Sequence, residues 1–137
     1  MVLTALRDDA LHTTADGYTL RLSLPWIRSL PLAALVGPEV QIDGRSTPAM
    51  VALGERRVDA ADLSDESAWW HIQDRVALHL TDAASPGIHE VSVSFGLEIP
   101  YLDGGPDGPL RLPFFFTRSL DTETPTAGVS RDVGSPA

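Results

Sequence analysis

Residues 89–99 constrain the fold most, because two kinds of side chain alternate there without interruption. One set comprises His89, Val91, Val93, Phe95, Leu97 and Ile99, and the residues between them are polar or small. A period of two places successive side chains on opposite faces of a strand. The segment therefore predicts a long central strand, in an antiparallel sheet that faces water on one side.

Shorter segments repeat this pattern and are separated by turn residues. Further strands are predicted over residues 18–24, 40–42, 49–53, 57–58, 69–73, 76–80 and 110–118. Asp43-Gly44 and Gly54-Glu55 are typical of tight turns, and residues 60–67 are the one stretch suited to a helical turn, capped by Asp59 or Ser64. Seven or eight short strands without a convincing helix predict an antiparallel β-sandwich, with a barrel as the alternative.

The 137 residues suit a single domain. We place an N-terminal segment over residues 1–15 and the β-sandwich domain over residues 16–120. From residue 121 onwards the composition turns to Thr, Pro, Gly and Ser, so residues 121–137 are expected to form a mobile tail.

Charge and composition exclude several classes of partner. The formal net charge is −9, and all ten basic residues are scattered arginines, which argues against nucleic-acid binding. The chain has no cysteine, so it has no disulfide framework. The first residues do not read as a signal peptide, and the longest apolar stretch, residues 32–37, is too short to cross a bilayer. We expect a cytoplasmic protein that binds no membrane.

No catalytic constellation is evident. His12, His71, His79 and His89 lack the compact spacing of a metal site, so we expect them at the surface or at strand edges. The acidic clusters fall in turns, and no serine lies on a nucleophile elbow. The sequence therefore predicts no catalytic residue, cofactor or metal ligand on this chain. A small metal-dependent barrel enzyme using three of the histidines stays an alternative.

Several aromatic residues cannot all face one core. Phe114, Phe115 and Phe116 are consecutive on a predicted strand, and Trp69 adjoins Trp70, so at least one ring of each set must point outward. Outward aromatic rings near arginines are typical of a protein interface. Cover by the chain's own loops is one alternative, and a stand-alone carbohydrate-binding module with Trp69-Trp70 as its platform is another.

A corner bracketed by prolines follows the strand of residues 18–24. In it, Trp26 and Arg28 lie between Pro25 and Pro31. A helix would not tolerate these prolines, and a core strand has no use for the arginine. The prolines limit the entropy lost on docking, so the corner is a candidate anchor for a partner.

Five segments, taken in order, resemble the small β subunit of bacterial C-glycoside deglycosidases. They are PWIRSLPL (residues 25–32), VQIDG (40–44), WWHIQD (69–74), PGIHEV (86–91) and LEIPY (97–101). The likeness extends over residues 16–120. It departs at Ile27, where an aromatic residue is expected.

The resemblance implies a function. Enzymes of this family cleave the carbon–carbon bond between a sugar and an aromatic, flavonoid-type aglycone, after a separate oxidoreductase has made the 3-oxo-C-glycoside. A TIM-barrel α subunit, similar to sugar-phosphate isomerases, holds a divalent metal of the manganese type and the acid and base groups. The β subunit is a β-sandwich that completes and stabilises this hetero-oligomeric lyase. The residues expected to contact the α subunit are Trp26, Arg28, Tyr101, Phe114, Phe115 and Phe116.

Overall fold

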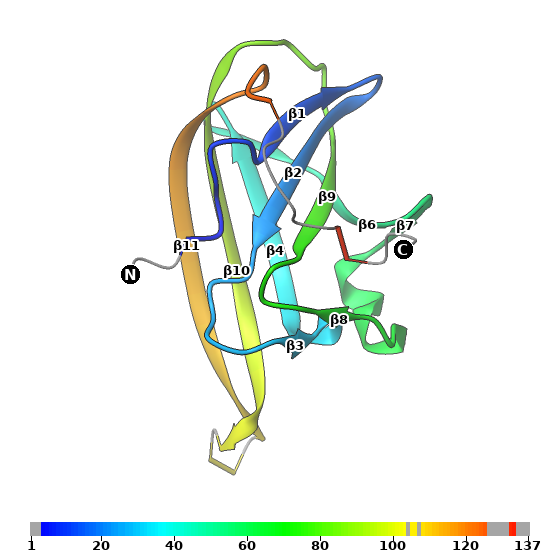
Figure 1. Cartoon of the computed structure of the whole chain (residues 1–137), viewed down its shortest axis with the longest axis vertical. Coiled ribbons are helices and arrows are strands. Elements are labelled where there is room, and N and C mark those ends of the chain that lie inside the picture. The colour runs from blue at the N-terminus through cyan, green and yellow to red at the C-terminus, as the bar shows by residue number, and fades with distance from the viewer. Residues whose placement is uncertain (1–3, 104, 107, 126–131, 134–137) are drawn as a thin grey trace.

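The computed structural model describes residues 4–103, 105–106, 108–125 and 132–133. Most of its strands form two antiparallel sheets packed face to face (Figure 1). The first contains, in spatial order, β1 (Leu11–Thr14), β2 (Gly17–Ser23), β9 (Arg75–Thr81), β6 (Ala49–Leu53) and β7 (Arg56–Val58). The second contains β11 (Pro109–Asp121), β10 (Ile88–Asp103), β4 (Leu35–Ile42) and β5 (Arg45–Thr47). The predicted β-sandwich is confirmed.

A small third sheet lies at one end of the sandwich, where β3 (Leu30–Pro31) pairs with β8 (Trp69–Trp70). The helical elements of the described residues are two short 3-10 segments, η1 (Leu32–Ala34) and η2 (Ala60–Asp65). The carboxylate of Asp59 caps η2 by accepting a hydrogen bond from the Ala61 N–H at 2.9 Å, as one of the two expected caps. The described residues form more strands than expected, because β1, β3 and β5 have only two to four residues each and are too short to show a clear alternation.

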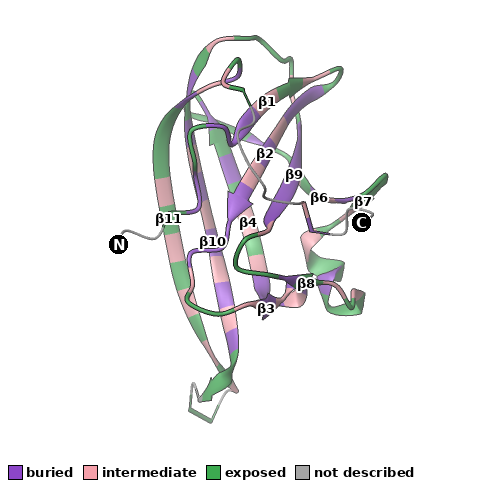
Figure 2. Ribbon diagram, in the orientation of Figure 1, coloured by how far each residue is buried: buried purple, intermediate pink, exposed green. Residues whose placement is uncertain are grey.

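The predicted long strand, β10, lies between β11 and β4 and alternates along most of its length between buried and partly exposed side chains. With β11 it forms a hairpin in which Phe95 opposes Phe114 and Phe116 opposes Val93. β11 is an edge strand, and its side chains alternate between exposed and half-buried, whereas β2 and β9 are mostly buried (Figure 2). β11 therefore forms one edge of the second sheet, and its side chains are only partly buried.

A turn and a bulge in the second sheet show why glycine is needed. The β4–β5 hairpin turns through Asp43 and Gly44, both with positive φ (52° and 81°), as its tight two-residue turn requires. In β4, Gly37 has φ 55° and lies where the pairing with β10 gains an extra residue, between the Ser94 and Gly96 positions. Such a bulge takes glycine because other side chains are strained in this backbone conformation.

The core lies between the facing sides of the two sheets. Its fully buried side chains include Tyr18, Leu20 and Leu22 from β2, Leu78 and Leu80 from β9, and Val91, Val93 and Leu97 from β10. Each aliphatic side chain of this kind stabilises the fold by about 1.5–3 kcal/mol relative to exposure. Period-two alternation in both sheets thus supplies one continuous apolar layer.

Both ends of the chain contribute to the sandwich. Residues 11–14 form β1, and Leu6 is fully buried. Near the other end Val133 is buried, and its N–H donates to the Arg75 carbonyl at 2.8 Å. Residues 126–131 and 134–137 of the expected tail lie outside the described residues, so its mobility stays a prediction. Neither helical element among the described residues has the length and apolarity to traverse a membrane.

Candidate functional site

The segment from Pro25 to Pro31, here called the proline corner, joins β2 to the small sheet at one end of the sandwich (Figure 1). β2 ends at Ser23, just before the buried Pro25, whose missing N–H cannot continue a ladder. Pro31 opposes Trp69 in the two-stranded sheet. The prolines thus turn the chain out of the core sheet and hold residues 26–29 at this end.

The proline corner contacts the far end of the β10–β11 hairpin. The Trp26 indole donates a hydrogen bond from Nε1 to the Tyr101 hydroxyl at 2.5 Å. The Arg28 guanidinium lies over the Tyr101 ring, with 5.3 Å between Cζ and the ring centroid, which is cation–π geometry. Three residues named from the sequence as interface candidates therefore form one cluster, although 75 positions separate Trp26 from Tyr101.

The corner is also tied to β8. The Ser29 hydroxyl accepts a hydrogen bond from the Ile72 N–H at 3.1 Å, and Leu30 pairs with Trp70. Trp70 is fully buried and donates from Nε1 to the Asp74 carbonyl at 3.2 Å, whereas Trp69 is 52% exposed. The expectation that one of these adjacent indoles points outward is confirmed.

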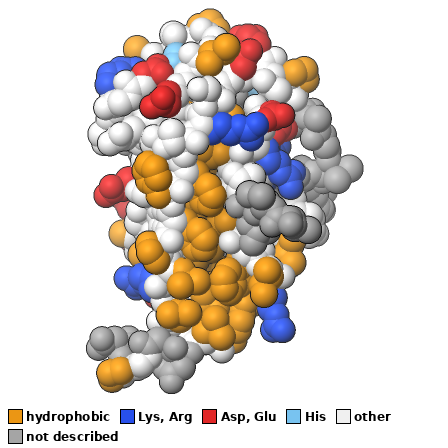
Figure 3. Space-filling model, turned by 90° about the vertical axis from the view of Figure 1, so that its left-hand side faces the viewer, with side chains coloured by type: hydrophobic (Ala, Val, Ile, Leu, Met, Phe, Trp, Pro, Cys, Tyr) orange, Lys and Arg blue, Asp and Glu red, His pale blue; other side chains and the backbone are white. Residues whose placement is uncertain are grey.

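These attachments bring several large apolar side chains to one end of the molecule. Ile27 is 68% exposed, Ile72 49% and Tyr101 46%. Together with Trp26 and Trp69 they define what we call the aromatic end. Hydrophobic side chains run down the adjoining side of the molecule and gather at this lower end (Figure 3). Clustered exposure of large apolar side chains is typical of a binding surface.

Comparison with known proteins identifies the family. No protein-family model matches the chain. The 3'-dehydrocarminate deglycosidase beta subunit of a Microbacterium species is 30% identical over 99 residues, which are 69% of this chain and 75% of that protein. The C-glycoside deglycosidase beta subunit of Microbacterium trichothecenolyticum is 31% identical over 104 residues, 71% of this chain and 78% of that protein. The chain belongs to the C-glycoside deglycosidase β-subunit family. The resemblance seen in the sequence is confirmed.

In this β subunit the three consecutive phenylalanines divide between two faces of the second sheet. Phe114 and Phe116 are half-buried and stack with Phe95, at centroid distances of 5.7 Å and 6.2 Å. Phe115 points to the other face and is 68% exposed, so the expected outward ring is confirmed. The three rings lie along β11, and their contact with an α subunit stays a prediction.

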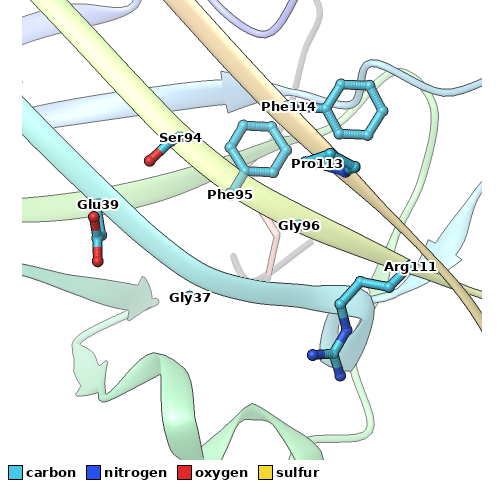
Figure 4. Close-up of a pocket in the computed structure, with 8 residues that line it drawn as sticks. All are labelled: Gly37, Glu39, Ser94, Phe95, Gly96, Arg111, Pro113 and Phe114. Atoms are coloured by element: carbon cyan, nitrogen blue, oxygen red, sulfur yellow. The ribbon is translucent and has the colours of Figure 1, made fainter. Parts of the chain in front are cut away.

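A hollow of about 460 Å³ lies on the second sheet, next to the bulge in β4 (Figure 4). Gly37 and Gly96 line the hollow and have no side chains to fill it. The Glu39 carboxylate and the Arg111 guanidinium lie on opposite sides of the hollow (Figure 4). Arg111 already pairs with Glu98 at 2.9 Å. The hollow is open and shallow, and its lining holds no nucleophile–base pair.

The predicted exposure of the histidines was wrong for two of the four. His79 and His89 are buried, with 5% and 8% exposure, rather than lying at the surface. Their polar neighbours come from distant segments: His79 lies 3.3 Å from the Asp16 carboxylate, and His89 contacts Asp43. The part of the chain that the structure describes contains no group of three histidine or acidic side chains able to hold a metal ion.

His89 is the centre of a polar cluster at the opposite end of the sandwich, here called the histidine end. Its Nδ1 lies 2.6 Å from a carboxylate oxygen of Asp43, and its Nε2 lies 2.6 Å from the Ser85 carbonyl and 3.5 Å from the Ser85 hydroxyl. The Tyr18 hydroxyl accepts a hydrogen bond from the Ser85 N–H at 2.9 Å. Sequence reasoning missed this cluster, because its members lie in separate turns and strands.

Serine, histidine and aspartate thus lie together, but not in a catalytic arrangement. Because the Asp43 carboxylate and the Ser85 carbonyl are both acceptors, both ring nitrogens of His89 donate. The Asp43 hydrogen bond holds the pKa of His89 above its ordinary value of 6.5. The same bond, with the Glu90 N–H, lowers the pKa of Asp43 below 3.8. A charged imidazole with no free lone pair cannot take a proton from Ser85, so the cluster joins loops and does not activate a nucleophile.

Proposed function

We propose that this β subunit is a non-catalytic component of a hetero-oligomeric C-glycoside deglycosidase, and that it assembles with a metal-dependent TIM-barrel α subunit through its aromatic end. Family membership supports the enzyme class. The Trp26–Arg28–Tyr101 cluster, surrounded by exposed Ile27 and Trp69, is the observation that favours this end as the docking surface.

The proposed reaction assigns the chemistry to the partner. In a 3-oxo-C-glycoside, the ketone acidifies the C–H bond at the neighbouring carbon. A base on the α subunit removes that proton, and the electrons expel the aromatic carbon as the carbon–carbon bond breaks. A divalent metal held by the α subunit would supply positive charge for the negative charge that develops on the ketone oxygen. The aglycone carbon takes up a proton, which balances the elimination.

In this scheme the β subunit stabilises the assembled lyase in the cytoplasm. An apolar surface that stays exposed on the free subunit becomes buried on assembly, and the hydrophobic effect drives this step. The proline corner favours docking because its backbone is already restricted by Pro25 and Pro31, so little conformational entropy is lost. Its attachments to Tyr101 and Ile72 restrict it further.

Co-expression with a sugar-isomerase-like α subunit, sought among the reading frames next to that of this chain, tests the proposal. We expect the two chains to co-elute in size-exclusion chromatography, and the complex to cleave a 3-oxo-C-glycoside that neither chain cleaves alone. Elution as two separate components would contradict the proposed assembly. Full activity of the α subunit without this chain would contradict the stabilising role.

A further inference from the structure

Arg28 differs from most other arginines of the chain. Seven arginines form ion pairs with acidic residues of the same chain, namely Arg21–Asp132, Arg45–Asp82, Arg56–Glu66, Arg57–Asp16, Arg75–Asp9, Arg111–Glu98 and Arg118–Asp8. Arg28 is exposed, and its side chain contacts the ring of Tyr101 instead. Among the described residues it pairs with no carboxylate, although acidic residues outnumber basic ones by 19 to 10 in the whole chain.

Among the described residues, the Arg28 guanidinium contacts the Tyr101 ring and uses none of its hydrogen-bond donors. Tyr101 supports one face of the group at 5.3 Å from its ring centroid, and Trp26 fixes the Tyr101 hydroxyl through the 2.5 Å hydrogen bond. A guanidinium stacked in this way still offers N–H donors at its edge, in a fork that matches both oxygens of a carboxylate. Arg28 is therefore prepared for a planar anionic acceptor.

The surroundings of Arg28 decide what kind of acceptor fits. A partner that covers Ile27, Trp69 and Tyr101 also removes water from the guanidinium between them. An unpaired charge buried in this way is strongly unfavourable, so the covering surface must supply a compensating negative charge. A net charge of −9 repels acidic groups from most of the chain, so an unpaired cation also gives an acidic partner group a preferred place to dock.

We propose that Arg28 receives a carboxylate of the α subunit, from an aspartate, a glutamate or the chain terminus, in a two-point ion pair within the interface. This inference rests on the proposed function and adds the chemistry of the contact. The aromatic residues supply the buried area. The Arg28–carboxylate pair sets the orientation of the two subunits.

Binding measurements on the purified subunits test the pair. We expect Arg28→Ala to weaken the dissociation constant for the α subunit about 10- to 100-fold. Arg28→Lys keeps the charge but loses the two-point geometry, so it should restore only part of this loss. Raising the salt concentration should weaken the wild-type complex more than the Arg28→Ala complex.

Arg45→Ala is the matched control, because Arg45 is another arginine with an exposed side chain (60%) and lies near the histidine end. It should bind as the wild type does, and the circular dichroism of all variants should match. Wild-type affinity for Arg28→Ala would overturn the ion pair while leaving the proposed assembly intact. A variant that binds normally but loses kcat/KM would also overturn it, by placing Arg28 against substrate. If the wild-type subunits form no complex, the proposed function itself fails.

Discussion

The two ends of the sandwich differ in whether their side chains find partners within the same chain. At the histidine end, His89, Asp43, Ser85 and Tyr18 bond to one another across three separate segments of the chain. At the aromatic end, large apolar side chains stay exposed, and Arg28 lacks a carboxylate partner among the described residues. Tyr101 lies twelve positions after His89 in β10, roughly 40 Å at the rise of an extended strand.

This difference indicates that the two ends of the fold have different roles. Hydrogen bonds within the chain close the histidine end and stabilise the subunit itself. The aromatic end is restrained through the contacts of Trp26 and Ser29, but its large apolar side chains stay exposed. Rigidity combined with exposure is what a docking surface requires. Changes at the aromatic end should therefore affect assembly, and changes at the histidine end should affect stability.

The largest effect is expected from a charge at the aromatic end. Ile27→Asp places a carboxylate where we expect an apolar surface to be buried, and it should weaken binding to the α subunit about 100-fold. The free subunit should keep its thermal midpoint, because Ile27 is 68% exposed. Isothermal titration calorimetry and thermal melting measure the two properties separately.

Ile88→Asp controls for this change, because Ile88 is 73% exposed and lies next to His89 at the histidine end. It should bind the α subunit with wild-type affinity. Equal loss of binding in both variants would end the distinction between the two ends.

A smaller effect is expected from His89→Gln, which should lower the free energy of unfolding by about 1–2 kcal/mol at pH 6 through loss of a charged hydrogen bond. The pKa of His89 is raised in the folded chain, so its contribution is complete below the ordinary value of 6.5. The contribution is lost as the pH rises through the raised folded-state pKa. Denaturant unfolding of both proteins across this pH range should show their difference shrinking as the pH rises.

The charged groups around His89 act on its pKa in opposite directions, and their net effect is to raise it. Arg45 opposes the charged imidazole, whereas the hydrogen bond to Asp43 favours it and is the larger influence. His71→Gln changes an exposed histidine and is the control, which should leave the free energy of unfolding at the wild-type value. A difference between wild type and His89→Gln that grows with pH would show that His89 is neutral in the folded subunit.

Local pattern predicted much of the fold. Alternation located β2, β10 and β11 closely, because along most of each strand one set of alternate side chains is more buried than the other. It described β9 incompletely, since residues 75–80 are buried on both faces and His79 faces away from the core. Distant segments cover that second face, and periodicity within one strand carries no information about them.

The candidate site was predicted in its residues but not in its geometry. The prolines and the unusual arginine drew attention to the corner, and residue type alone favoured an interface. The contact of Trp26 and Arg28 with Tyr101 depends on how far the β10–β11 hairpin extends, which is a property of the assembled sheets. The burial of His89 likewise depends on Asp43, which is 46 positions away in the sequence.

Hydrogen–deuterium exchange of the β subunit, alone and in complex with the α subunit, tests the central claim most directly. Amide exchange reports local protection along the backbone. We expect slower exchange in the complex over residues 26–30, 69–73 and 99–102, with no change over residues 43–45 and 85–89. Protection confined to the histidine end, or unchanged exchange at the aromatic end, would contradict it.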